Sequence, residues 1–196
     1  MFKNLENILK KLTVKDINLK NKKVLLRVDF NVPLNDDLTI SDDTRIKASL
    51  ETIKYLLKNN CSIILMSHLG RPKGIDEKLS LKPVALRLEK LLNHEIQFAK
   101  DAIGDETQKL KDNLKPNEII LLENLRFYPE EEKPNEHNEF AKSLAKGCDI
   151  YVNDAFGTSH RKHSSVYEIT KFFKDKSLAG FLLEKEINFL FYEIFM

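Results

Sequence analysis

Short, continuous apolar segments that alternate with stretches of helical periodicity constrain the fold of this chain most. Four segments are strongly apolar and a fifth is weaker; they lie at 24–28, 62–66, 119–122, 150–152 and 96–98. Within each segment the apolar residues are continuous rather than alternating, which is typical of strands covered on both faces. Such strands belong to parallel sheets, whose neighbouring strands are usually joined through a helix.

The segments between these strands supply the helices. Apolar residues recur at helical spacing over 43–57 and 80–92, and shorter helices are predicted at 106–114 and 136–146. Candidate caps are Ser41, Asp42 or Asp43 for the first helix, Ser80 for the second, which also has Pro83 in its first turn, and Gly147 after the last. The charged stretch 129–138 (PEEEKPNEHN) is predicted to be a solvated loop. Strand–helix alternation of this kind predicts an α/β domain with a parallel sheet and right-handed crossovers.

Bulk properties narrow the class of protein. The length of 196 residues fits one domain, and 32 basic against 30 acidic residues leave a formal net charge of +2, which does not suggest a nucleic-acid-binding protein. No apolar stretch reaches the roughly 18 residues of a membrane span, and the N-terminal segment lacks a secretory apolar core. The two cysteines form no C-x-x-C pair, so we expect reduced thiols in a cytosolic protein and neither a zinc nor a redox site.

Arginine is scarce and unevenly placed in this lysine-rich chain. Only six arginines occur, and Arg71, Arg126 and Arg161 each lie in a loop just after a predicted strand. Arg27 lies within the first strand, Arg45 opens the following helix, and Arg87 is interpreted as a surface residue in mid-helix. Ligands of parallel sheets bind beyond the carboxyl ends of the strands, and guanidinium groups bind phosphate or carboxylate oxygens in pairs. The placement therefore predicts a site for a small phosphorylated anion.

Other polar residues share these loops. His68, His160 and His163 lie beside the arginines, and Gly70 and Gly157 permit tight turns that present N–H groups to an anion. Asp29 and Asn31, after the first strand, suit a ligand hydroxyl group.

Each of these residues, taken alone, has a plainer interpretation. A single arginine after a strand is usually a surface residue or part of a structural ion pair, and His68 alone could be a satisfied loop histidine. Asp29 could cap the next turn, with Asn31 supporting an Asx-turn. Several such loops meeting at one sheet edge favour the anion site, because a cluster of positive charges is costly without an anion. Neither G-x-x-x-x-G-K-[ST] nor G-x-G-x-x-G occurs, so nothing indicates a site for ATP or NAD.

Six segments together resemble the phosphoglycerate kinase family, in its order and at its spacing. They are RVDFNVP (27–33), DDTRI (42–46), SHLGRP (67–72), LLENLRF (121–127), YVNDAFGTSHRKHSS (151–165) and GFLLEKEINFL (180–190). The resemblance covers about 13–190. It implies a three-layer α/β/α sandwich around a parallel, Rossmann-like sheet, which binds 3-phosphoglycerate, and a second domain that binds Mg-ATP or Mg-ADP. The family transfers a phosphoryl group reversibly between 1,3-bisphosphoglycerate/ADP and 3-phosphoglycerate/ATP.

The resemblance also implies roles for individual residues. Arg45 is the implied catalytic residue, facing the transferring phosphoryl group, and no metal ligand is implied on this chain. The implied substrate-binding residues are Asp29, Phe30, Asn31, Arg45, His68, Leu69, Gly70, Arg71, Arg126 and Arg161. A supporting basic patch is implied at Arg27, His160 and His163. A cytoplasmic protein is expected, typically monomeric, without nucleic-acid or membrane partners, and with ATP/ADP and Mg²⁺ held by the other domain.

The sequence departs from the family in length and in its ending. It is about half as long, and 191–196 (FYEIFM) do not resemble the family's continuation. We therefore expect an N-terminal extension at 1–12, a phosphoglycerate-binding domain at 13–180 and the start of an interdomain hinge helix at 181–196, in a truncated or frameshifted frame or one half of a split gene. The alternatives are a kinase chain and a module that binds 3-phosphoglycerate without turnover. A nucleic-acid-binding domain is disfavoured because aromatics are not interleaved on one face.

Overall fold

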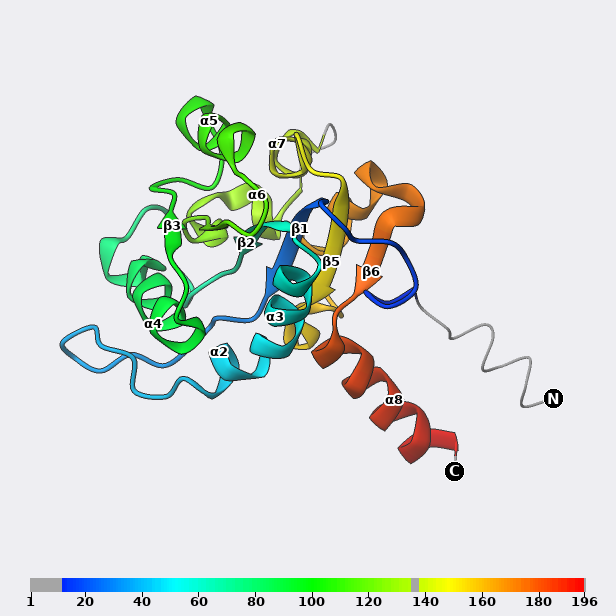
Figure 1. The fold of residues 1–196 in the computed structure, drawn as a ribbon. Coiled ribbons are helices and arrows are strands. Elements are labelled where there is room, and N and C mark those ends of the chain that lie inside the picture. Colours follow the sequence, from blue (N-terminus) through cyan, green and yellow to red (C-terminus); the bar gives the residue numbers. More distant parts are fainter. Residues whose placement is uncertain (1–11, 135–137, 196) are drawn as a thin grey trace.

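A six-stranded parallel sheet forms the centre of the molecule, in a computed structural model that describes residues 12–134 and 138–195. The strand order is β3-β4-β2-β1-β5-β6 (Figure 1). The strands are β1 (Lys23–Val28), β2 (Ser62–Met66), β3 (Ile96–Phe98), β4 (Ile119–Leu121), β5 (Ile150–Asp154) and β6 (Ser177–Ala179). All pairings between them are parallel. The five predicted strands are confirmed, and β6 is an edge strand that the sequence did not predict.

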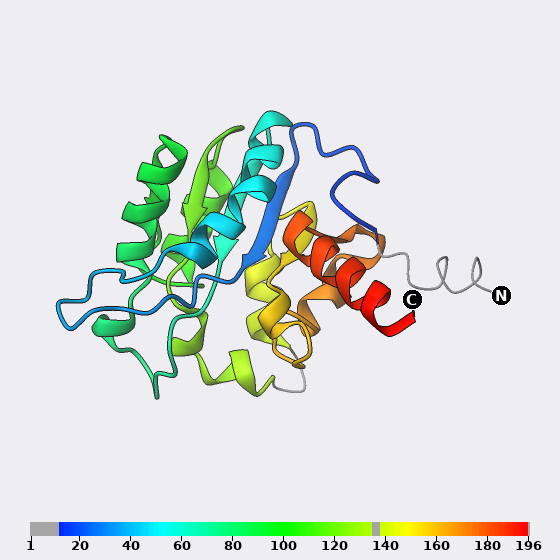
Figure 2. The same ribbon diagram turned by 90° about the horizontal axis from the view of Figure 1, so that it is seen from below.

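Helices cover both faces of the sheet and make the predicted three layers (Figure 2). The long helices are α3 (Leu50–Lys58), α4 (Lys82–Leu92), α5 (Asp105–Asn113) and α8 (Phe181–Phe195). The short ones are α2 (Thr44–Ala48), α6 (Pro129–Glu132) and α7 (Glu139–Ala145). Single 3₁₀ turns occupy η1 (Glu77–Leu79), η2 (Leu125–Phe127), η3 (Phe156–Thr158), η4 (Glu168–Phe172) and η5 (Lys174–Lys176).

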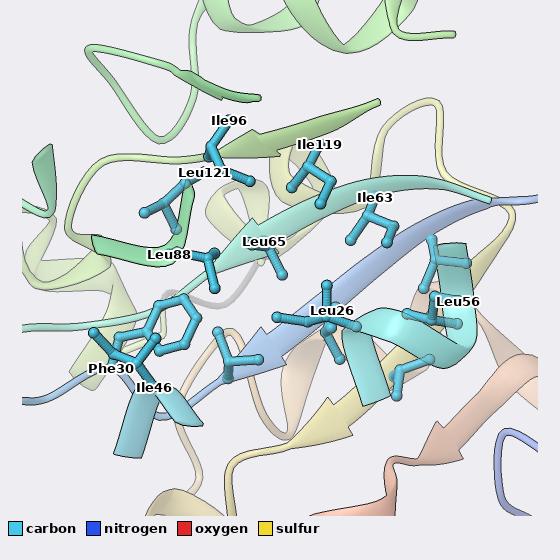
Figure 3. Packing of buried hydrophobic residues seen from close by; sticks show 14 of the residues in the cluster. Leu26, Phe30, Ile46, Leu56, Ile63, Leu65, Leu88, Ile96, Ile119 and Leu121 are labelled. Atoms are coloured by element: carbon cyan, nitrogen blue, oxygen red, sulfur yellow. The ribbon is translucent and has the colours of Figure 1, made fainter. Parts of the chain in front are cut away.

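Successive residues of β1 enter two separate cores. Leu26 packs with Ile53 of α3 and Leu88 of α4 on one face, in the cluster of Figure 3. Leu25 packs on the other face with Leu144 of α7 and other buried residues. Both residues are fully buried, as expected when a strand is covered on both faces.

The predicted helix at 43–57 is wrong as a single helix. It is divided at Ser49, whose hydroxyl donates to the Ile46 carbonyl at 2.8 Å and so bonds locally to the end of α2. Asp43 occupies the cap position but makes no capping bond with its side chain; it forms ion pairs with Lys47 and Arg87 instead. Arg87, predicted to be a surface residue, is therefore a partly exposed link between α4 and the start of α2.

The other helix predictions hold with shifted ends. The predicted helix at 80–92 begins two residues later, with Pro83 in the first turn of α4 and the Ser80 hydroxyl accepting from the Lys82 N–H at 3.2 Å. The helix predicted at 106–114 is α5. That predicted at 136–146 is α7, although part of its expected start lies outside the described residues. Gly147 follows α7 with φ +77°, a conformation that favours glycine.

The prediction of a solvated loop at 129–138 is wrong in its first half. Residues 129–132 form α6, and the Glu131 side chain is fully buried. Residues 135–137 lie outside the described residues. Glu131 is buried because it faces Ser165 and Arg27, which are distant in sequence, rather than solvent.

The last helix projects from the β6 side of the domain (Figure 1). Its first turn is held by Asp154 at the end of β5, whose carboxylate accepts from the backbone N–H groups of Leu182 and Leu183 at 2.9 and 3.2 Å. Neither α8 nor any other helix among the described residues is long and apolar enough to cross a membrane.

Candidate functional site

Four adjacent strands, β4, β2, β1 and β5, send their following loops into one hollow of about 290 Å³ at the carboxyl edge of the sheet. The hollow is lined by Asp29, Asn31, Arg45, His68, Gly70, Arg71, Arg126, Gly157, Thr158 and Arg161. Eight of these belong to the ten residues for which substrate binding was implied, and Thr158 had not been singled out. Four arginines against one aspartate make the lining strongly positive, as a site for a multiply charged anion requires.

The loop after β1 places two acceptors in the hollow. The Asp29 carboxylate accepts from the Asn31 N–H at 3.2 Å, so Asp29 makes an Asx-type turn that the plainer interpretation had given to Asn31. The Asn31 side-chain oxygen accepts from the Gly70 N–H at 2.8 Å and so links the loops after β1 and β2. The loop after β5 also comes close, since a β-carbon at Gly157 would lie 3.1 Å from Asp29 Oδ2.

Arg45 reaches the hollow from the start of α2 and forms an ion pair with Asp29. Its side chain is 53% exposed, whereas that of Asp29 is 12% exposed. The arginine is therefore held at the mouth of the hollow by a carboxylate and is otherwise open to solvent.

His68 is a neutral group in the wall of the hollow. Its Nδ1 lies 3.0 Å from Nη2 of Arg27, and a guanidinium can only donate, so Nδ1 accepts and the ring proton sits on Nε2. Burial, together with the charges of Arg27 and Arg126, lowers the pKa of His68 to about 2. The side chain can thus donate a hydrogen bond without carrying a charge.

A side chain that the sequence reasoning missed holds the loop after β2 in place. Asn124 accepts from the Leu69 N–H at 3.1 Å and donates to the Leu69 and Leu79 carbonyls at 2.8 and 2.9 Å. Asn124 lies within the LLENLRF segment, but an asparagine in that position carries no local signal of a partner 55 residues away. Gly70 follows with φ +64°, and a β-carbon there would lie 2.9 Å from Leu79.

The arginines of the hollow divide into a buried one and exposed ones. Arg126 is 9% exposed, donates from Nη1 to the Gly70 carbonyl at 2.7 Å, and pairs through Nε with Glu132 at 3.0 Å. Burial lowers the pKa of Arg126 from its usual value. Arg71 and Arg161 are exposed, and neither forms an ion pair within the described residues. They are available to an incoming anion.

Five residues with implied roles do not line the hollow, namely Phe30, Leu69, His160, His163 and Arg27. Phe30 is fully buried in the core of Figure 3, and Leu69 is 1% exposed in the same core, so their side chains support the loops rather than face a ligand. His160 accepts from Arg161 Nε at 3.3 Å and is exposed. His163 is buried below the hollow, where burial, with further lowering by Arg126 and Arg161, brings its pKa to about 4.

Arg27, of the implied basic patch, is the fifth of these residues, and it contacts the lining of the hollow through His68. It is fully buried and donates to Ser165 Oγ at 2.9 Å, to the Val28 carbonyl and to His68. Its neighbours across the sheet are Met66 of β2 and Asn153 of β5.

A larger groove of about 1310 Å³ lies elsewhere, around α4 and the loop before α2. Its lining has six acidic side chains against four basic ones, and among them Arg87 pairs with Asp43 while Glu123 accepts from the Leu81 N–H. It therefore lacks the unbalanced positive charge of the smaller hollow, which we take as the candidate site.

The described residues offer no place for a magnesium ion. They contain no group of three or more histidine, cysteine or acidic side chains that could hold a metal, and the hollow has a single carboxylate, already paired with an arginine. The residues present therefore do not fit Mg²⁺ or its nucleotide complex.

Known proteins resemble the chain over nearly all of it. The family model described as phosphoglycerate kinase matches residues 14–193. The phosphoglycerate kinase of Aquifex aeolicus is 52% identical over 182 residues, and that of Campylobacter jejuni subsp. jejuni is 56% identical over 179. The protein named phosphoglycerate kinase 3, cytosolic, of Arabidopsis thaliana is 54% identical over 178 residues. These alignments cover 91–93% of this chain but only 44–45% of the relatives.

Solved structures agree with these sequence relatives. Phosphoglycerate kinase from Pyrococcus horikoshii has a TM-score of 0.84 at 35% identity, covering 94% of this chain and 46% of that one. The enzyme from Coxiella burnetii has a TM-score of 0.80 at 34% identity, covering 92% of this chain and 44% of that one. The chain thus spans less than half the length of these relatives, and both its sequence and its fold show that it belongs to the phosphoglycerate kinase family.

Proposed function

We propose that this chain supplies the 3-phosphoglycerate-binding half of a phosphoglycerate kinase. The reaction is reversible phosphoryl transfer between 1,3-bisphosphoglycerate with ADP and 3-phosphoglycerate with ATP. The observation that carries the proposal is the hollow at the ends of four adjacent strands, lined by four arginines and one aspartate. Nucleotide and Mg²⁺ would be held by other residues, because this hollow suits an anion and not a metal.

The polar groups of the hollow suggest how the ligand is shared among them. Arg71, Arg126 and Arg161 would bind the 3-phosphate, with His68 as a neutral donor beside them. Asp29 and Asn31 would bind the glycerate hydroxyl. Arg126 must then share its guanidinium between the phosphate and Glu132, 3.0 Å away.

Arg45 suits a different role, at the reacting carboxylate. Its exposed guanidinium pairs with Asp29 in this structure, and a ligand hydroxyl that binds Asp29 would compete with that ion pair. Released from Asp29, Arg45 would stabilise the negative charge that spreads over the transferring phosphoryl group. A carboxylate oxygen of 3-phosphoglycerate forms the new bond to phosphorus as the bond to the ADP oxygen breaks. The attacking group is already anionic, so no general base is needed, which agrees with the neutral state of His68.

A second candidate is a module that binds 3-phosphoglycerate without turnover. It is favoured by the absence of any metal-binding cluster from the described residues. In either case we propose a cytoplasmic protein that acts as a monomer, does not bind nucleic acid and has no membrane partner. The relative from Arabidopsis thaliana, whose name includes the word cytosolic, supports the location.

Titration calorimetry with 3-phosphoglycerate and a coupled ATP-consumption assay test the proposal. We expect Arg71→Ala or Arg126→Ala to weaken binding, whereas Arg45→Ala should leave it nearly intact. Arg87→Ala is the matched control, because that arginine pairs with Asp43 outside the hollow. Binding without turnover would leave only the module for this chain. A folded wild-type chain that binds no 3-phosphoglycerate would refute the site, and a large loss of binding in Arg45→Ala would refute the division of roles.

A further inference from the structure

A fully buried carboxylate, that of Glu131, does not line the hollow and has no part in the binding roles described above. It belongs to α6, the segment that composition suggested would be solvated. Its Oε2 accepts from the Ser165 N–H at 3.0 Å, and its Oε1 lies 2.6 Å from Ser165 Oγ. Burying a carboxylate costs free energy unless it is hydrogen-bonded, and both partners of Glu131 belong to Ser165. Its burial therefore points to a specific structural role.

Ser165 connects this carboxylate to Arg27. Nε of Arg27 lies 2.9 Å from Ser165 Oγ, and an arginine nitrogen can only donate. Ser165 Oγ therefore accepts a hydrogen bond from Arg27 and donates its own to Glu131 Oε1. Both oxygens of Glu131 accept hydrogen bonds, which is the pattern of an ionised carboxylate.

The charge of Glu131 explains how Arg27 can be buried. Arg27 is fully inaccessible to solvent, and a buried guanidinium needs an opposite charge and hydrogen-bond acceptors nearby. Burial raises the pKa of Glu131, while Arg27 and the hydrogen bonds from Ser165 act in the opposite direction. His163 is another ionisable neighbour of Glu131, since its Nδ1 lies 3.9 Å from Oε1.

Arg27 connects Glu131 and Ser165 to the hollow through His68. Its Nη2 donates to Nδ1 of His68 at 3.0 Å, so the orientation of the guanidinium decides which ring nitrogen of His68 carries the proton. The hydrogen bonds thus run from Glu131 through Ser165 and Arg27 to His68, which lines the hollow.

We propose that Glu131 is a positioning residue of the anion site. Acting through Ser165, it holds Arg27 in the orientation that keeps His68 in the Nε2–H form, a neutral hydrogen-bond donor to the anion. The identity of that anion as 3-phosphoglycerate rests on the proposed function. The tautomer of His68 does not, because it is a property of the ligand-free chain.

Ser165→Ala is the more informative test, because it removes the connecting hydroxyl and leaves both buried charges in place. The ¹⁵N chemical shifts of the His68 ring report its tautomer, and titration calorimetry reports affinity for 3-phosphoglycerate. In the wild-type chain we expect a protonated Nε2 and an unprotonated Nδ1. In Ser165→Ala we expect a mixture of tautomers and an affinity lower by up to about tenfold, because only the fraction of chains with a protonated Nε2 is competent to donate to the anion.

Tyr151→Phe is the matched control. The Tyr151 hydroxyl donates to the Ser165 carbonyl at 2.9 Å and is buried, so its removal also costs an interior hydrogen bond at the same residue. It leaves the path from Glu131 to His68 untouched, and we expect wild-type tautomer and affinity. Glu131→Gln should change both properties as Ser165→Ala does; if it fails to fold, Ser165→Ala alone decides.

The proposal is overturned if folded Ser165→Ala keeps the wild-type His68 tautomer and affinity. It is also overturned if Tyr151→Phe changes them to the same extent, because the effect would then be general loosening. A wild-type chain that does not bind 3-phosphoglycerate would refute the proposed function, and the His68 shifts would still decide the role of Glu131.

Discussion

Replacing Gly180 with alanine would test how tightly α8 is joined to the end of β5. A β-carbon at position 180 would lie 2.3 Å from Asp154 Oδ1 and 2.4 Å from its Cγ, far inside contact distance. The Asp154 side chain is fully buried, and the same Oδ1 accepts from the N–H groups of Leu182 and Leu183. Asp154 can relieve the overlap only by turning away, which breaks both hydrogen bonds.

The size of the effect follows from those two bonds. A hydrogen bond to a charged group contributes about 1.5–3 kcal/mol, so Gly180→Ala should lower the free energy of unfolding by about 3–6 kcal/mol. That is a large part of the roughly 5–15 kcal/mol by which a domain is stable. Urea unfolding followed by circular dichroism at pH 7.5 measures the loss. Gly180→Ala should also increase the rate of amide hydrogen exchange at Leu182 and Leu183 by a larger factor than at the amides of the sheet.

A double-mutant cycle with Asp154→Ala separates this cause from general strain. Asp154→Ala breaks the same two hydrogen bonds, so the double mutant should lose markedly less stability than the sum of the single mutants. Additive losses, or a Gly180→Ala variant within about 1 kcal/mol of wild type, well below the estimate for two such bonds, would show that Asp154 does not hold α8 in this way.

Three further predictions concern charge and packing. Burial raises the pKa of Asp154 to about 6 from an ordinary 3.8, so the folded chain binds this proton more tightly than the unfolded chain does. The resulting stability is full below pH 4 and is lost as the pH rises through 6; Asp154→Asn should flatten that slope in urea unfolding, and an unchanged slope would contradict the assignment. Leu65→Ala, in the core of Figure 3, should cost about 2–5 kcal/mol by the same assay, against less than about 0.5 kcal/mol for the 56% exposed Leu86→Ala. Glu132→Gln should raise calorimetric affinity for 3-phosphoglycerate by up to about fivefold, because Arg126 no longer shares its charge with a carboxylate; a lower affinity would refute this competition.

The sheet could be predicted because its strands are apolar on both faces, a pattern that needs no knowledge of the rest of the chain. The missed strand, β6, has only three residues; it pairs with β5 on one side and has only an isolated bridge to Thr13 besides, so its neighbours rather than its own composition make it a strand. The break at Ser49 was missed for the opposite reason. The apolar periodicity continues across Ser49. The hydrogen bond from its hydroxyl to the Ile46 carbonyl, which competes with the hydrogen bonds of a continuous helix, leaves no trace in that periodicity.

Most of the candidate site could be predicted because a parallel sheet brings the ends of its strands together. The residues that support the site could not. Glu131 stands in a run of three glutamates between two prolines, and nothing local distinguishes it from its exposed neighbours. Its burial is decided by Ser165 and by Arg27, which lies on a strand more than 100 residues earlier. The role of Asn124 likewise depends on residues distant in sequence, because its side chain hydrogen-bonds to Leu69 and Leu79 of the loop after β2.

The arginines of the site differ in how far they are buried and in which internal partners they have. Arg126 is desolvated and oriented by the Gly70 carbonyl before any ligand arrives, so its interaction with an anion requires little reorganisation. The fully buried Arg27 reaches the hollow only through His68. Arg45 is exposed and paired with Asp29, the residue best suited to a ligand hydroxyl. A ligand that occupies Asp29 would therefore release Arg45 at the moment when its charge is needed at the carboxylate. Under the proposed function, Arg126 and the exposed Arg71 and Arg161 account for binding while Arg45 is reserved for phosphoryl transfer, which is why loss of Arg45 should affect turnover far more than affinity.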